Sequence, residues 1–150
     1  MNPGSAAAVA LCVVGGLGGA VQAAVMGRFG DRIGTLEAVA FSTLGTAVIA
    51  LALLAVSRRS VAGYVEGAHS PVWMWSAAAM SALIVFGLTF ASPRIGTTAT
   101  IGILVAGNLV MAALIDQYGW FGLDKIALTW PRVLGAVLLA VGAALTLWRR

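Results

Sequence analysis

The sequence predicts an all-α membrane protein with five transmembrane helices in a single domain. The 150-residue chain is 61% hydrophobic and only 9% charged, whereas about 25% of the residues are charged in a typical soluble domain. Five apolar stretches approach the length of about 20 residues that a helix needs to cross the hydrocarbon core. They are residues 5–26, 36–57, 72–91, 96–116 and 132–148. All five tryptophans lie at or near the ends of these stretches, where indole rings favour the headgroup boundary.

The first span, 5–26, is expected to be a retained helix rather than a signal peptide. No basic residue precedes it, and its apolar run is longer than the stretch of about 7–15 residues found in signal peptides. Gly15 and Gly19 are four residues apart, a spacing that allows close helix packing in lipid. The same helix face carries Gln22, which either lines a pathway or hydrogen-bonds a neighbouring helix. Cys12 is expected to be a small apolar packing residue, because the chain has no second cysteine.

The second span, 36–57, begins beside Glu37 and carries a small, weakly polar face that includes Ser42 and Thr46. Two interpretations of these hydroxyls stay open: they line a pathway, or they bond back to their own helix. Glu37 is a candidate for ion coupling, and it also fits a structural role at the positive end of the helix dipole. The following loop contains His69, which is expected to be solvated rather than a ligand or a base.

The third span, 72–91, is expected to end at Pro93, because proline interrupts helical hydrogen bonding. On the fourth span, 96–116, Thr97 and Asn108 are eleven residues apart and therefore share one stripe. Asn108 has the same two open interpretations as Gln22: a pathway residue or a contact between helices. Asp116 closes this span as a second candidate for ion coupling, or as a solvated carboxylate or a partner of Lys125 or Arg132.

The fifth span, 132–148, is expected to start at Pro131. Gly135 and Gly142 are seven residues apart and lie on one face, as expected for a contact within or between subunits. The preceding loop, 117–131, is apolar enough to lie in the plane of the membrane interface.

The positive charges around the five spans are almost equal on the two sides of the membrane. One side has the amino terminus and the loops 58–71 and 117–131, and the other has the loop 27–35, the turn 92–95 and the carboxyl terminus. The first side carries Arg58, Arg59, Lys125 and Arg132 with the terminal amine, and the second carries Arg28, Arg32, Arg94, Arg149 and Arg150. Orientation follows the imbalance of Lys and Arg in short loops. The balance predicts insertion in both orientations and antiparallel pairing. The alternative is a single orientation, set by a few Lys and Arg residues whose effects on insertion are unequal.

The sequence contains no signature of an enzyme, and we expect no catalytic residue, cofactor or metal. It has no nucleotide-binding loop, nucleophile elbow or ligand cluster. No charged residue falls at the centre of a span, where proton-driven exporters usually have a titratable group. The expected surroundings are the lipid bilayer, with a small-molecule substrate and no nucleic-acid partner.

The second half of the chain resembles the YdcZ-like family of the drug/metabolite transporter superfamily, which is related to the small multidrug resistance exporters. The resemblance extends over nearly the whole chain. Its most specific part runs from Pro93 to Gly122. The residues that carry it there are Ser92-Pro93-Arg94-Ile95-Gly96-Thr97-Thr98, Ala106-Gly107-Asn108, Leu114-Ile115-Asp116-Gln117-Tyr118-Gly119 and Gly122, followed by Arg132-Val133-Leu134-Gly135 and Gly142. In the first half Val21-Gln22-Ala23-Ala24 and the stretch from Gly34 to Gly45 also fit.

The chain departs from the family pattern at two polar positions. The family usually has glutamine where this chain has Asn108, and asparagine where it has Met26, so its substrate preference is expected to differ. The resemblance implies an inner-membrane exporter and includes members that insert in both orientations. We therefore expect an antiparallel homodimer, or a heterodimer with an oppositely oriented paralogue, that moves a small cationic or amphipathic compound. The alternative is a non-transporting scaffold or a subunit of a larger membrane complex.

Overall fold

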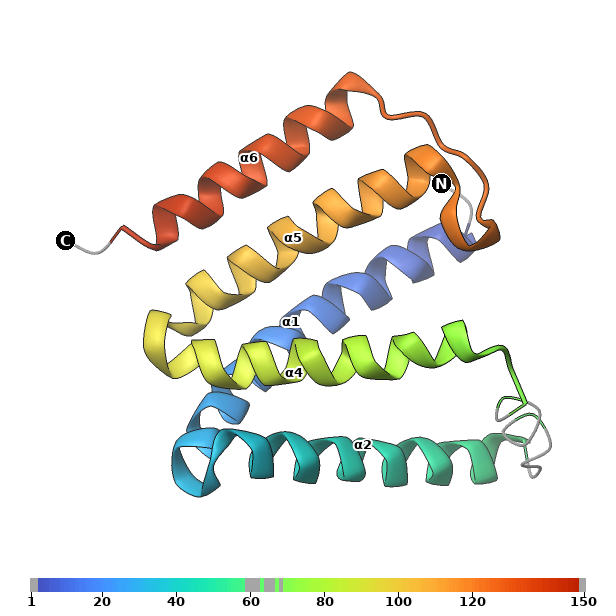
Figure 1. Ribbon diagram of the computed structural model, residues 1–150. Helices are drawn as coiled ribbons and strands as arrows, with labels where there is room; N and C mark the ends of the chain where they lie inside the picture. Colours follow the sequence, from blue (N-terminus) through green and yellow to red (C-terminus); the bar gives the residue numbers. More distant parts are fainter. Residues whose placement is uncertain (1–2, 59–62, 64–66, 68, 149–150) are drawn as a thin grey trace. The chain divides into compact units, whose positions relative to one another are not determined.

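A computed structural model describes residues 3–58, 63, 67 and 69–148, and it is helical with no strand among these residues (Figure 1). Four of the helices are long and apolar enough to cross a membrane, and the last is a shorter apolar helix of 17 residues. The elements are α1 (Pro3–Ile33), α2 (Thr35–Arg58), the 3₁₀ turn η1 (Val72–Trp75), α4 (Ser76–Ile95), α5 (Thr97–Tyr118), the 3₁₀ turn η2 (Trp120–Gly122) and α6 (Trp130–Thr146). The expected all-α class is therefore confirmed.

The chain divides into two compact units, and each is described by itself. One unit contains 1–24 and 91–150, and hence α5 and α6; the other contains 25–90, and hence α2 with the end of α1 and most of α4. Both divisions fall inside a helix. The expectation of a single domain stays a prediction.

The corner between α1 and α2 differs from the loop predicted over 27–35. Helix α1 continues to Ile33, and Gly34 is the one residue between the two helices. Its φ of +102° is a conformation that favours glycine. Hydrogen bonding continues across it, from Gly34 N–H to Gly30 O at 2.9 Å and from Ala38 N–H to Gly34 O at 3.0 Å. The prediction was wrong because the stretch contains no proline, and Gly27 and Gly30 weaken a helix without ending it, so the helix extends beyond its apolar part.

The corner between α4 and α5 also corrects a sequence expectation. Pro93 does not end the helix; it lies inside the last turn of α4, which continues to Ile95. A proline so close to the end removes one helical hydrogen bond without stopping the turn. The residue that ends α4 is Gly96, which has a φ of +88°. Its N–H donates to Ser92 O at 3.0 Å, and its carbonyl accepts the N–H of Thr100 at 3.1 Å.

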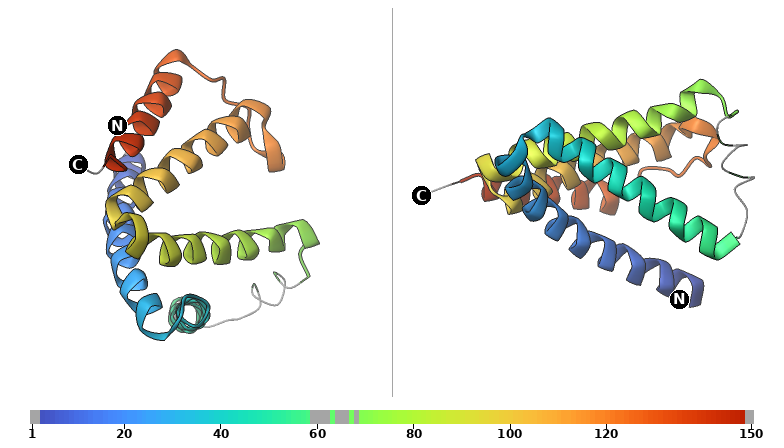
Figure 2. Two further views of the ribbon diagram at one scale, coloured as in Figure 1. Left: turned by 60° about the vertical axis from the view of Figure 1, so that its left-hand side comes forward. Right: turned by 90° about the horizontal axis from the view of Figure 1, so that it is seen from below.

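Within the first unit, α5 and α6 lie side by side and are joined by a long connection (Figures 1 and 2). Their closest approach is at Gly102, where an added Cβ would lie 3.3 Å from the Cβ of Ala143. Arg132 and Asp116 form an ion pair of 3.2 Å between the two helices toward their other ends. Pro131 occupies the first turn of α6, as predicted.

Within the second unit, the end of α1 packs against α4 and the start of α2. A Cβ added at Gly30 would lie 2.7 Å from Thr89 Cγ2, so a larger residue would not fit without a shift. The rings of Phe29 and Phe41 meet edge to face, with centroids 5.5 Å apart. Thr89 is buried and donates its hydroxyl to Val85 O at 2.7 Å. Contact between helices in this unit therefore relies on glycine and on aromatic rings.

Candidate functional site

The polar stripe predicted on α5 consists of Thr97 and Asn108. Within the described structure, Thr97 hydrogen-bonds another residue and Asn108 does not. The Thr97 hydroxyl lies 3.0 Å from the hydroxyl of buried Ser92, across the Gly96 corner. Asn108 lies at the middle of α5, is exposed, and hydrogen-bonds no other residue of the described part of the chain. The two residues share a face but are about 16 Å apart along the axis. Thr97 therefore belongs to the corner between α4 and α5, whereas Asn108 lies at the middle of α5.

Asn108 lies on the outer side of the hairpin formed by α5 and α6. It is about 120° around the helix from Gly102 and about 160° from Ala106, the residues on the side that meets α6. Its amide is therefore directed away from the contact between α5 and α6.

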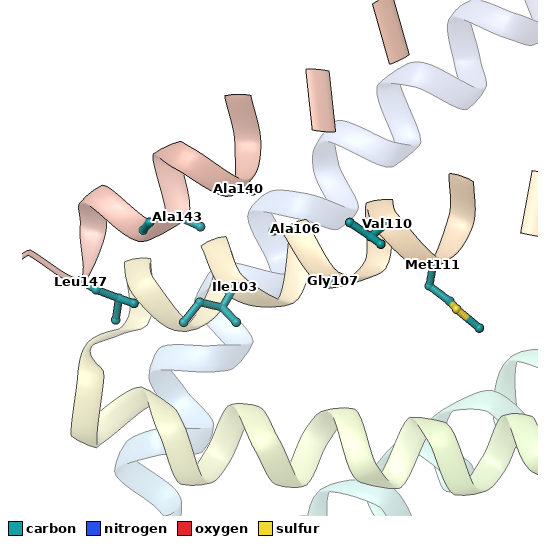
Figure 3. A pocket seen from close by; sticks show the side chains of 9 residues that line it. Ile103, Ala106, Gly107, Val110, Met111, Ala140, Ala143 and Leu147 are labelled. Atoms are coloured by element: carbon teal, nitrogen blue, oxygen red, sulfur yellow. The ribbon is translucent and has the colours of Figure 1, made fainter. Parts of the chain in front are cut away.

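A groove of about 610 Å³ lies between α5 and α6 (Figure 3). In Figure 3, Ala143 and Leu147 of α6 lie across from Ile103 of α5, and Val110 and Met111 follow farther along α5. Its lining consists of apolar residues from the two helices: Ile103, Ala106, Gly107, Val110, Met111, Ala140, Ala143, Ala144 and Leu147. Neither Asn108 nor Gln22 belongs to it. This groove is therefore not the polar cavity that a pathway through those two residues requires.

Gln22 lies on α1 and is exposed, with no hydrogen bond to another described residue. Its neighbours in sequence behave differently: Ala23 is fully buried and Met26 is 4% exposed. Met26, one of the two positions at which a departure from the family pattern was expected, is therefore an apolar and covered side chain. Gln22 and Asn108 are the two amides that lie away from the span ends, and each lacks a hydrogen-bond partner within its own unit.

On the hydroxyl face of α2, one of the two hydroxyls bonds back to its own helix. The Thr46 hydroxyl donates to the carbonyl of Ser42 at 2.9 Å, one helical turn earlier. Ser42 itself is half-buried. The Thr46 hydroxyl is therefore satisfied by its own helix, and a role in transport requires that it also face a substrate.

The two carboxylates considered for ion coupling both have structural contacts. Asp116 Oδ2 accepts a hydrogen bond from Arg132 at 3.2 Å, one of the pairings considered from the sequence. Both side chains of the pair are partly exposed, at 36% and 47%. Glu37 lies in the first turn of α2 with its carboxylate directly over Gly34. That position fits the positive end of the α2 dipole.

The glycines singled out from the sequence make no close contact in the described structure. A Cβ added at Gly15, Gly19, Gly135 or Gly142 would meet nothing within 4 Å. The glycine that brings α5 and α6 together is Gly102, which was not predicted. Gly102 and Ala106 are small residues four positions apart, a signal of the same kind as the pair Gly15 and Gly19.

The remaining candidates of the sequence analysis have no ligand arrangement. Cys12 is exposed, and no group of three metal-binding side chains occurs in the part of the chain that the structure describes. His69 is exposed in the loop before η1. Arg59, Arg149 and Arg150 lie outside the described residues.

Comparison with known proteins identifies the family. The family described as "Putative inner membrane exporter, YdcZ" matches residues 7–145, which include all the helices except their outermost residues. No curated protein and no solved structure gives a significant match to the chain. The match agrees with the motifs between Pro93 and Gly122 and with the apolar helices of the structure. The chain therefore belongs to the YdcZ family of inner-membrane exporters.

Proposed function

We propose that the protein is one subunit of a dimeric inner-membrane transporter that exports a small cationic or amphipathic compound by alternating access. The family description supports export as the general activity. The two chains of the dimer would lie antiparallel, which turns one asymmetric subunit into an inverted repeat. Many secondary transporters use that architecture for alternating access.

The observation that carries this proposal is the uncovered amide of Asn108. It lies half-way along α5, so it is near the middle of the bilayer when α5 spans the membrane. A polar group at this depth is costly unless it is hydrogen-bonded or faces water. No residue of its own unit hydrogen-bonds it, so its partner lies outside that unit. We propose that this partner is a second subunit, a substrate or the water of a pathway, each of which a transport dimer would supply.

The second support is the face of α6 that carries Gly135 and Gly142. These glycines are open, whereas α6 meets α5 through Ala143 on another face. Small residues allow two helix backbones to approach closely in lipid. We therefore place the contact with the second subunit on this glycine face, with Gly15 and Gly19 of α1 as the alternative.

Ion coupling through Glu37 or Asp116 would require these carboxylates to leave their present contacts. Asp116 would release Arg132, and Glu37 would move from Gly34. Both lie near span ends rather than at the centre. We propose Gln22, Ser42, Thr46, Thr97 and Asn108 as the pathway residues and keep the two carboxylates as secondary candidates.

A ligand-stabilisation screen of the purified protein tests the transport function. We expect a subset of quaternary ammonium or aromatic cations to raise the melting temperature, because a ligand that binds only the folded state stabilises it. The same compounds should leave protein-containing vesicles faster than empty ones. A scaffold would show neither effect with any compound of the panel, and that outcome would favour the non-transporting alternative.

Reporter fusions at the carboxyl terminus test the antiparallel arrangement. If the charge balance controls insertion, a cytoplasmic reporter and a periplasmic reporter should both be active. Adding two lysines beside Arg28 and Arg32 should move that end of α1 to the cytoplasm in nearly all molecules. A wild-type protein with one fixed orientation would refute the homodimer, and a heterodimer with a paralogue would then be required.

A further inference from the structure

The segment from 119 to 130, here called the connector, links α5 to α6 and exposes an unusual amount of apolar surface. Six of its side chains are apolar or aromatic and between 42% and 74% exposed: Trp120, Phe121, Leu123, Ile126, Leu128 and Trp130. Its two charged residues, Asp124 and Lys125, have opposite signs. A continuous apolar patch of this kind on a protein surface marks an interaction site.

The connector is held in place by the last turn of α5. The N–H of Ile126 donates to the carbonyl of Asp116 at 2.9 Å, and the N–H of Leu128 donates to Gln117 Oε1 at 2.8 Å. A Cβ added at Gly119 would lie 2.8 Å from Lys125 Cγ, so the lysine stem packs on this glycine. The connector therefore folds back along α5 and satisfies part of its backbone there. Non-helical backbone near the hydrocarbon needs such partners.

Helix lengths place the connector at the edge of the hydrocarbon. The 22 residues of α5 extend over about 33 Å, and the 17 residues of α6 over only about 26 Å. The hydrocarbon core is about 30 Å thick, so α6 alone is too short to cross it upright. The pair of Arg132 and Asp116 shows that α6 starts at the level of Asp116, inside the end of α5. On this geometry, the connector covers the distance between the start of α6 and the surface of the hydrocarbon core.

The aromatic residues of the connector have the arrangement expected of an interfacial belt. Tyr118 and Trp120 stack with their ring centroids 5.7 Å apart and form one amphipathic surface. Phe121 has a φ of +62°, which a bulky residue rarely adopts, and its ring is 62% exposed. Indole and phenol rings partition to the headgroup boundary, where an apolar body and a polar edge are both solvated.

We propose that the connector is a membrane anchor that binds the headgroup boundary of a phospholipid bilayer and fixes the depth of the short helix α6. The bilayer is favoured over a protein partner because α5 is long and apolar enough to span it and the connector is continuous with α5. The proposal does not depend on transport.

Tryptophan fluorescence of the full-length protein in vesicles tests this anchor. Variants that retain only Trp120 or only Trp130, with phenylalanine at the other four tryptophan positions, should be quenched most by lipids brominated near the glycerol end of the acyl chain. Bromines near the methyl end should quench less. Aqueous iodide should quench each residue at least about threefold less than a solvated tryptophan. Because depth is the same in both leaflets, mixed orientations do not affect the quenching by brominated lipids.

Two control positions calibrate the measurement in a chain without other tryptophans. His69→Trp should report the aqueous phase, and Val105→Trp, near the middle of α5, should report the bilayer centre. Strong iodide quenching of Trp120 and Trp130 would overturn the anchor and make the connector an aqueous loop. Quenching by neither agent would also overturn it and indicate a protein partner. If removing four tryptophans prevents folding, a spin label at Ile126→Cys with Cys12→Ala gives the same depth with one side chain changed in the connector.

Discussion

In the hairpin of α5 and α6, small residues occur on two faces that differ in their contacts. The inner face is the one on which the two helices meet, and the outer face is turned away from that contact. On the inner face, Gly102 lies against Ala143 and the two helices touch. On the outer face, Gly135 and Gly142 are open, and Asn108 presents an unpaired amide. The inner face is therefore covered within the first unit, whereas no residue of that unit lies against the outer glycines or hydrogen-bonds Asn108. A pattern of small residues predicts that a helix will be approached closely, but it does not say by which helix.

Substitution of the outer glycines is expected to have the largest effect. Gly135→Leu with Gly142→Leu should abolish the dimer in detergent crosslinking, because leucine blocks close backbone contact. Helix insertion should continue, since a Cβ added at either glycine meets no described residue within 4 Å. The matched control is Val137→Leu with Val141→Leu, at positions on another face of α6 that are equally exposed. Unchanged crosslinking in the glycine variant would move the contact to α1.

Asn108 provides the second test of the outer face. Asn108→Ala should strongly reduce export or ligand binding with little change in melting temperature, because no described residue of the chain hydrogen-bonds the amide and would lose a partner. Asn108→Gln keeps the amide with one more methylene, and it should retain transport with an altered preference among compounds. If Asn108 instead packs in a tight contact between helices, the glutamine variant should lose stability by about 1–3 kcal/mol with unaltered selectivity.

The inner face should respond with a smaller and purely structural effect. Gly102→Leu should lower the free energy of unfolding by about 1–3 kcal/mol, since a Cβ there already lies 3.3 Å from Ala143. Thermal unfolding in detergent measures the change. Gly107→Leu is the control, because its added Cβ would meet nothing within 4 Å. An equal decrease in the free energy of unfolding of both variants would contradict the assignment of Gly102 as the contact between α5 and α6.

The sequence predicted where the helices lie but not where they end. Hydropathy identifies each span because only about 20 apolar residues are needed to cross the membrane. Hydropathy does not reveal that the helix continues through Arg28 and Arg32. Outside the hydrocarbon, polar residues are compatible with a helix and lower the hydropathy without ending it. The end of α4 was misplaced for a related reason: Pro93 was given more weight than Gly96, whose positive φ ends the helix.

For the candidate site, the sequence left several partners open, and the structure shows some of them. Asp116 was expected to be solvated or paired with Lys125 or Arg132, and the structure shows the pair with Arg132. For Thr46 the sequence left two interpretations open, and the structure shows the bond to its own helix. The partner of Asn108 does not follow from the sequence, because one polar residue on a helix shows only that a partner is needed and not which group supplies it. The roles of the proposed pathway residues therefore stay predictions.

The single-residue corners at Gly34 and Gly96 have an evolutionary consequence. Because almost no loop separates the helices there, the charges that bias insertion are carried by the helices themselves, by Arg28 and Arg32 on α1 and by Arg94 on α4. A mutation at any of these positions changes a helix end and an insertion signal at once. Natural selection on membrane orientation therefore cannot act on these residues independently of selection on the fold.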